Sequence, residues 1–190
     1  MASTTKSTSK EALLAAAATT LSKNPGASLS EIAAKAGVGR ATLHRHFPSR
    51  DDLIRELALE CLRQTDAATD DIPFEALSAA EGLRRVLEAV VPLGDRYHFL
   101  MQEPAAAQGP EITETTERQL AEMAELVEAA KAEGSIAAEV PTAWVVAAID
   151  ALVYAAWSAV EDGSVARRDA AALAFRTLID GLKPTTGDKS

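Results

Sequence analysis

A cluster of hydrogen-bond donors lies between residues 37 and 50, and no carboxylate interrupts it. Arginine side chains bind guanine edges or phosphates with two donors at once, while threonine and histidine contribute single hydrogen bonds. Such a run of donors with no acid to neutralise it is typical of a surface that meets nucleic acid. The donors that lie outside the expected apolar face are Arg40, Thr42, His44, Arg45 and His46.

Charge is distributed unevenly along the 190 residues, whose formal net charge is −9. Residues 1–50 hold seven Lys/Arg and two Asp/Glu, a net +5 that suits phosphate neutralisation. Residues 65–190 hold 10 Lys/Arg and 22 Asp/Glu, a net −12. Because acidic surface repels nucleic acid, we expect contact to be confined to the N-terminal part.

Two short helices joined through a glycine must position the donors. Ser28 followed by Glu31 is a capping-box signature that opens the first helix, and Gly37 suits its C-terminal turn. The second helix begins at residue 39 or 40 and ends before Pro48. The expected buried side comprises Leu29, Ile32, Ala33, Val38, Leu43 and Phe47. This arrangement predicts a helix-turn-helix, whose second helix enters the major groove.

The rest of the chain also favours helices. Alanine accounts for 40 of the 190 residues, and no segment alternates as a strand would. Apolar residues recur at helical spacing over residues 74–91, 112–133, 141–161 and 165–182. We therefore predict an all-α protein of about nine helices. It comprises a three-helix DNA-binding domain over residues 1–48 and a second helical domain over residues 49–190.

Residues 9–57 resemble the DNA-binding part of the TetR family of bacterial transcriptional regulators. The resemblance is carried by Glu31-Ile32-Ala33, Ala36-Gly37-Val38, Thr42-Leu43, His46-Phe47 and Ser49-Arg50-Asp51-Asp52-Leu53. One residue departs from the pattern, because His44 stands where the family usually has a tyrosine that contacts DNA. A histidine still hydrogen-bonds a phosphate or a base edge.

The resemblance implies separate roles within the DNA-binding segment. The residues implied to approach bases are Arg40, Ala41, Thr42 and His44. The residues implied to hold phosphates are Ser28, Arg45, His46 and Arg50. Two alternatives stay open: His46 caps the recognition helix, or Arg50 pairs with nearby acids.

In the family the remaining helices bind a ligand and form a dimer, with the last two helices of each subunit in an intermolecular four-helix bundle. Here the dimer contacts would be Val153, Trp157, Val160, Phe175, Leu178 and Ile179. The ligand contacts would be Tyr97, His98, Phe99, Met101, Gln102, Trp144, Asp150 and Tyr154. The alternative for the aromatic residues is ordinary core packing. Asp150 faces a ligand cation, pairs across the dimer or reaches solvent.

Several other classes of site find no support. The sequence has no Ser-His-Asp spacing, no phosphate-binding glycine loop and no HExxH or paired-cysteine metal motif, so we expect no catalytic residue, metal or cofactor. Cys61 is the single cysteine, which favours a reducing, cytoplasmic location. Residues 143–160 are the most membrane-like, but Asp150 interrupts them, so we expect a helix packed on other helices rather than a membrane span.

The expected function is that of a homodimeric regulator of transcription that is not an enzyme. It would bind a palindromic operator in double-stranded DNA, repress transcription, and be released by an unknown small-molecule effector. Two alternatives remain. In one, the regulator has no ligand and responds to a protein partner. In the other, the chain is an all-helical adaptor or enzyme.

Overall fold

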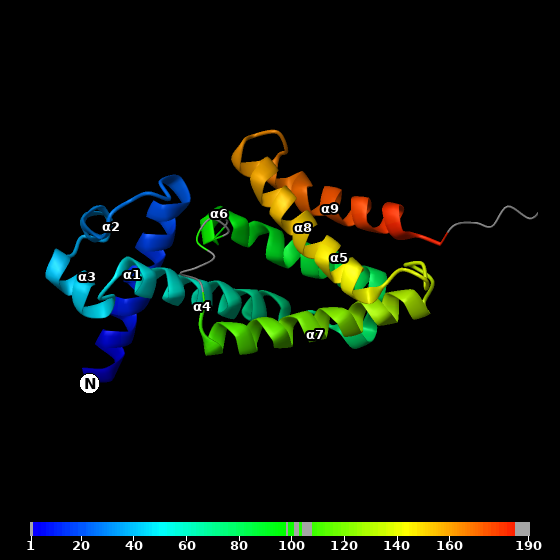
Figure 1. The fold of residues 1–190 in the computed structure, drawn as a ribbon, viewed down its shortest axis with the longest axis horizontal. Helices are drawn as coiled ribbons and strands as arrows, with labels where there is room; N and C mark the ends of the chain where they lie inside the picture. Colours follow the sequence, from blue (N-terminus) through cyan, green and yellow to red (C-terminus); the bar gives the residue numbers. More distant parts are fainter. Residues whose placement is uncertain (1, 98, 101–102, 104–107, 185–190) are drawn as a thin grey trace, which may run out of the picture. The chain divides into compact units, whose positions relative to one another are not determined.

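The computed structural model describes residues 2–97, 99–100, 103 and 108–184, and this part of the chain contains helices and no strand (Figure 1). Its α-helices are α1 (Ala2–Lys23), α2 (Leu29–Lys35), α3 (Arg40–His46), α4 (Arg50–Thr69), α5 (Ala79–Val90), α6 (Gly94–Tyr97), α7 (Pro110–Ala132), α8 (Thr142–Glu161) and α9 (Arg167–Leu182). Two short 3-10 helices, η1 (Phe74–Ala76) and η2 (Val91–Leu93), flank α5. The predicted all-α class is confirmed.

The chain divides into two compact units. Unit 1 comprises residues 1–63 and 95–113, and unit 2 comprises residues 64–94 and 114–190. The sequence placed the boundary after residue 48, whereas the structure keeps the first part of α4 with the three N-terminal helices. It also adds residues 95–113, which are distant in sequence, to the same unit.

Unit 1 is organised around the apolar faces of its short helices. In α1, Leu13, Ala17 and Leu21 are buried at intervals of four residues, as one helix face requires. They share the interior of this unit with Ile32, Leu43, Phe47, Leu53, Ile54 and Leu57. Since α1 packs on α2 and α2 packs on α3, the outer side of α3 is left to its polar residues.

Unit 2 is built on α5, α7, α8 and α9, and α9 packs against both α5 and α8 (Figure 1). The N-terminus of α5 is capped twice. Ser78 Oγ accepts a hydrogen bond from Glu81 N at 3.2 Å, and the Glu133 carboxylate accepts from Ala79 N at 2.8 and 3.0 Å. These bonds satisfy amides that the helix itself leaves without partners.

A close approach joins the end of η2 to α8. A Cβ atom on Gly94 would lie 2.1 Å from Cδ1 and 2.2 Å from Cγ of Trp157, so the indole rests directly on the glycine backbone. The indole Nε1 is buried without a hydrogen-bond partner among the described residues. Apolar packing rather than a polar contact therefore holds this ring.

Candidate nucleic-acid interface

The start of α2 is locked by the predicted capping box. Ser28 Oγ accepts a hydrogen bond from Glu31 N at 3.3 Å, and Ser28 N donates to Glu31 Oε2 at 2.7 Å. The Ser28 hydroxyl also donates to Glu31 Oε2 at 2.8 Å. The bonds to the carboxylate, from the Ser28 backbone first and from its hydroxyl second, lower the pKa of the Glu31 carboxyl, which therefore stays ionised beside the helix N-terminus. Ser28 is exposed, as a phosphate contact at this position requires, although its hydroxyl is already used in the cap.

The turn between α2 and α3 depends on Gly37. Its φ of 68° lies in the left-handed region, which a residue with a side chain adopts at a cost. The turn places Val38 N within 3.0 Å of Ala33 O, and α3 then begins after Gly39. This geometry explains why a glycine follows Ala36 in the helix-turn-helix pattern.

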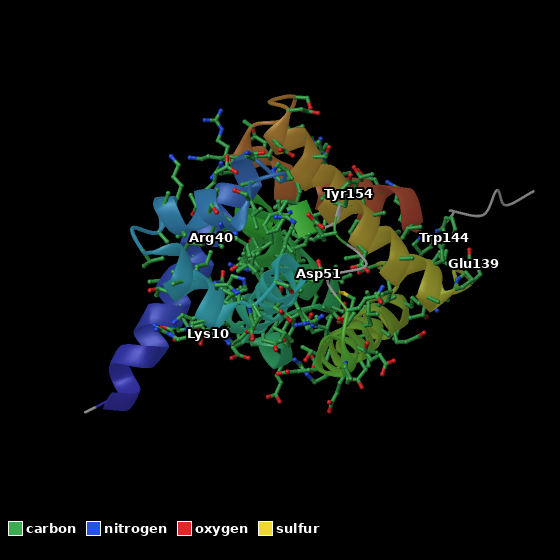
Figure 2. All side chains as sticks on the ribbon, turned by 60° about the vertical axis from the view of Figure 1, so that its left-hand side comes forward. Lys10, Arg40, Asp51, Glu139, Trp144 and Tyr154 are labelled. Carbon is green, nitrogen blue, oxygen red and sulfur yellow. The ribbon has the colours of Figure 1, made fainter. Side chains whose placement is uncertain are left out.

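The outer face of α3 carries the predicted DNA contacts. Arg40, Ala41, His44 and Arg45 are exposed, whereas Leu43 on the opposite side is buried. Figure 2 shows the Arg40 side chain projecting from this helix. Within the described part of the chain, no hydrogen bond or ion pair engages the side chains of Arg40, His44 or Arg45. Their donors are therefore available to a polyanion.

Two further predicted contacts are less open. Thr42 and His46 are partly buried, and the His46 ring lies 6.2 Å from that of Phe47 at an interplanar angle of 43°. Among the described residues the His46 side chain makes no hydrogen bond, and the amide at the end of α3, Phe47 N, bonds to Leu43 O. The proposed roles of Thr42 at bases and of His46 at phosphates remain predictions.

The Arg50 side chain is hydrogen-bonded within the protein, whereas the sequence led us to expect a phosphate contact. Its Nη1 donates to Ala27 O at 3.0 Å, and its Nη2 donates to Pro25 O at 2.6 Å and to Glu103 Oε1 at 2.5 Å. The side chain is partly buried. The second interpretation of the sequence, an arginine paired with an acid, describes this arrangement, and the acid lies 53 residues along the chain.

The predicted ligand contacts are divided between the two units. Tyr97 and Phe99 are buried in unit 1, where burial first and then the nearby Glu60 raise the pKa of Tyr97 to about 12. Trp144, Asp150 and Tyr154 are exposed on α8 in unit 2, and Figure 2 shows Trp144 and Tyr154 on that helix. His98, Met101 and Gln102 lie outside the described residues.

The predicted dimer contacts mostly face the interior of unit 2. Leu178 is only 2% exposed, in the core. Partly buried side chains pack against that core, namely those of Val153, Trp157, Val160, Phe175 and Ile179. The exposed large apolar side chains of the last two helices are instead Trp144, Tyr154 and Leu173. The sequence did not separate exposed from core-facing positions here, because both helices are apolar on nearly every side, and the six dimer contacts remain predictions.

Comparison with known proteins identifies the group to which these features belong. A family model described as bacterial regulatory proteins of the tetR family matches residues 13–57. The HTH-type transcriptional repressor LfrR of Mycolicibacterium smegmatis is 34% identical over 154 residues, which cover 81% of this chain and 80% of that protein.

Solved structures agree with the sequence match. A crystal structure of LfrR from Mycobacterium smegmatis in complex with proflavine superposes with a TM-score of 0.77 at 30% identity, covering 93% of this chain and 98% of that chain. The TetR-family regulator PfmR from Thermus thermophilus shares the fold, with a TM-score of 0.72 at 20% identity over 90% of this chain and 99% of that one.

These matches confirm the resemblance that residues 9–57 indicated. The matched segment, residues 13–57, contains the helix-turn-helix with its exposed basic face. The similarity to LfrR extends through most of the C-terminal helices as well. The chain therefore belongs to the TetR family and is a transcriptional regulator rather than an enzyme.

Proposed function

We propose that this regulator is a homodimeric repressor that binds a palindromic operator through α3 and releases it when a small molecule binds unit 2. The observation that carries the proposal is the exposed, unneutralised face of Arg40, His44 and Arg45, in a chain 34% identical to a repressor. A cytoplasmic location belongs to the proposal, because chromosomal DNA lies there in bacteria.

Each side chain of α3 has a proposed role set by its chemistry. Arg40 at the first position of the helix pairs with a guanine through two donors, and the methyl of Ala41 contacts a thymine methyl. His44 hydrogen-bonds a base edge or a phosphate in place of the family's usual tyrosine. Arg45 contacts a phosphate and sets the register of the helix in the groove.

The test of DNA recognition selects genomic fragments at about 0.15 M salt and compares variants on the recovered site. We expect Arg40→Ala to weaken binding by about 5- to 150-fold and His44→Ala by about 2- to 10-fold. Arg168→Ala is the matched control, since the Arg168 side chain is 86% exposed on α9 in unit 2. Sequence-independent binding by the wild type, or an equal loss in the control, would refute the proposed recognition.

The proposed dimer rests on an uncovered apolar face of α8. Trp144 is 66% exposed and Tyr154 is 48% exposed, and Ala147, Ala151 and Ser158 are exposed between and beyond them. Among the described helices, α8 alone is long and apolar enough to span a membrane. In a DNA-binding regulator, a second copy of the same helix accounts for this face, because apolar patches of this kind mark protein contacts.

The spacing of the exposed residues supports antiparallel pairing of two α8 helices. Trp144, Ala147, Ala151, Tyr154 and Ser158 follow the alternating three- and four-residue steps of a helix–helix seam. A two-fold axis at Ala151 brings Trp144 opposite Ser158 of the partner subunit. It brings Tyr154 opposite Ala148 of the partner subunit, next to Ala147 of the partner subunit. Large side chains then meet small ones, as a self-complementary interface requires.

Cross-linking tests this register. Ala151→Cys, in a chain that also carries Cys61→Ser, should form an intersubunit disulfide, because the axis brings its two copies within bonding range. Ala129→Cys on α7 is the control, since that alanine is also exposed. A monomer by light scattering would refute the dimer. A dimer that cross-links equally at both positions would refute the register alone.

The proposed effector is a planar aromatic cation. Unit 2 holds 19 Asp/Glu and 9 Lys/Arg, a net −10, which attracts cations. The relative LfrR was crystallised in complex with proflavine, a dye of this class. Two LfrR structures superpose on this chain to different extents, with TM-scores of 0.77 for the proflavine complex and 0.64 for the other, which supports a change of conformation on ligand binding in that protein. A response of the same kind is proposed here.

Calorimetric titration of the protein with proflavine in the absence of DNA tests the effector class, and avoids the stacking of the dye between base pairs. We expect saturable binding that Asp150→Asn weakens, because Asp150 is an exposed acid within the otherwise apolar helix α8, where a bound cation gains from its charge. Proflavine should then lower operator affinity. No binding by the wild type would favour control by a protein partner.

A further inference from the structure

Residues 95–113 are part of unit 1 by their packing, although both ends of the segment continue into unit 2. The chain leaves unit 2 after Gly94 and returns to it at Glu114. Phe99 is fully buried and Tyr97 is 2% exposed, so these two side chains share the interior of the DNA-binding unit. The chain therefore joins this segment to α5 on one side and to α7 on the other, while its described side chains pack within unit 1.

Arg50 connects this segment to the turn that precedes α2. The same Nη2 atom donates to Glu103 Oε1 at 2.5 Å and to Pro25 O at 2.6 Å, while Nη1 donates to Ala27 O at 3.0 Å. The side chains of Arg50 and Glu103 are only 32% and 25% exposed. Charge-assisted bonds in partly dry surroundings are stronger than ordinary ones, so a single guanidinium holds three chain segments in register.

A second contact on the same helix holds the segment further along. Arg55 Nε donates to Gln108 O at 3.1 Å, and Arg55 Cδ passes 3.7 Å from the position that a Cβ of Gly109 would occupy. Arg55 Nη1 also pairs with Asp52 at 2.9 Å in the first turn of α4. Both arginines belong to α4, so displacement of the segment is resisted by this helix at two points.

We propose that the Arg50–Glu103 ion pair couples the effector state to the DNA-binding helices, an inference that rests on the proposed function. When residues 95–113 shift, Glu103 moves the Arg50 guanidinium, and the carbonyls of Pro25 and Ala27 carry that movement to the start of α2. Arg50 is thus a positioning residue. Glu103 supplies its charge partner, and α3 follows α2 because the two helices pack together.

The operator experiment compares Glu103→Gln, Arg50→Lys and the control Glu111→Gln, a change of the same kind at an exposed residue of the same segment. Operator Kd is measured with and without saturating proflavine, and the ratio of the two values reports coupling. We expect a ratio of about 5 to 150 for the wild type and Glu111→Gln. For Glu103→Gln it should fall toward one with the ligand-free Kd little changed. The ratio for Arg50→Lys should fall in the same direction.

Amide hydrogen exchange provides a readout that needs neither DNA nor effector. Glu103→Gln should increase exchange at residues 24–36, far away in sequence, whereas Glu111→Gln should not. The proposed coupling is overturned if amide exchange at residues 24–36 is unchanged in Glu103→Gln. It is also overturned if that variant keeps the wild-type ratio of the operator Kd values with and without proflavine. A variant that loses operator affinity with its ratio intact also overturns it, because the pair is then structural only. If proflavine leaves the operator Kd of the wild type unchanged, the proposed effector is wrong. The hydrogen-exchange comparison then still tests whether Glu103 is coupled to residues 24–36.

Discussion

The contact between Gly94 and Trp157 predicts that a single added methyl group destabilises unit 2. In Gly94→Ala the new Cβ would lie 2.1, 2.2 and 2.6 Å from three atoms of the indole ring, where ordinary contacts are 3.4–4 Å. These atoms belong to the rigid base of the side chain, not to a flexible end. The ring must therefore move by more than an ångström, or the backbone must shift.

Two opposing effects set the size of the change. The backbone of Gly94 is α-helical (φ −55°, ψ −30°), so alanine gains about 0.5–1 kcal/mol from its higher helix propensity. Overpacking costs typically about 1–3 kcal/mol, and the rigid ring places this site at the upper end. We expect a net loss of about 2 kcal/mol, which corresponds to a fall of about 4–8 °C in melting temperature for a chain of this size.

Denaturant unfolding at two protein concentrations measures this loss and separates it from dimer dissociation. Gly181→Ala is the matched control, because nothing lies within 4 Å of the added Cβ and the glycine is in α9. It should raise stability by up to about 1 kcal/mol. In a Trp157→Leu background the overlap disappears, so Gly94→Ala should become neutral or stabilising, a coupling of about 2 kcal/mol.

A Gly94→Ala variant as stable as the wild type would refute the packing argument. So would an equal loss in the wild-type and Trp157→Leu backgrounds, because the loss would then not arise from the indole.

Three further predictions concern local geometry and reactivity. Gly37→Ala should lower the unfolding free energy by about 1–2 kcal/mol, because φ is 68° there; calorimetric melting checks it, and an unchanged melting temperature would count against the strain. Ser28→Ala should cost about 1 kcal/mol by removing the α2 cap, whereas Ser30→Ala, at an exposed position inside α2, should cost less in the same assay. Burial, and then Glu60, raises the pKa of Cys61 to about 12, so thiol labelling at pH 8 should be about two to three orders of magnitude slower than in denaturant. Immediate stoichiometric labelling of the folded protein would contradict that environment.

The sequence by itself determined the local features of the DNA-binding segment. The Ser28 and Glu31 cap, the left-handed Gly37 and the buried Leu43 all depend on residues within a few positions of one another. Helix periodicity and capping report such short-range relations directly. The exposed basic side of α3 follows from them, because burying one face of a short helix leaves the other face to solvent.

Only the tertiary structure decided which partners distant residues have. Arg50 has the chemistry of a phosphate ligand, but the fold brings the Glu103 carboxylate to it from 53 residues away. Likewise, Trp157 lies on Gly94 within the unit, while Trp144 on the same helix faces outward. Both tryptophans have the same side chain in the same apolar sequence. What separates them is the position of neighbouring helices, which the spacing of residues along one helix does not specify.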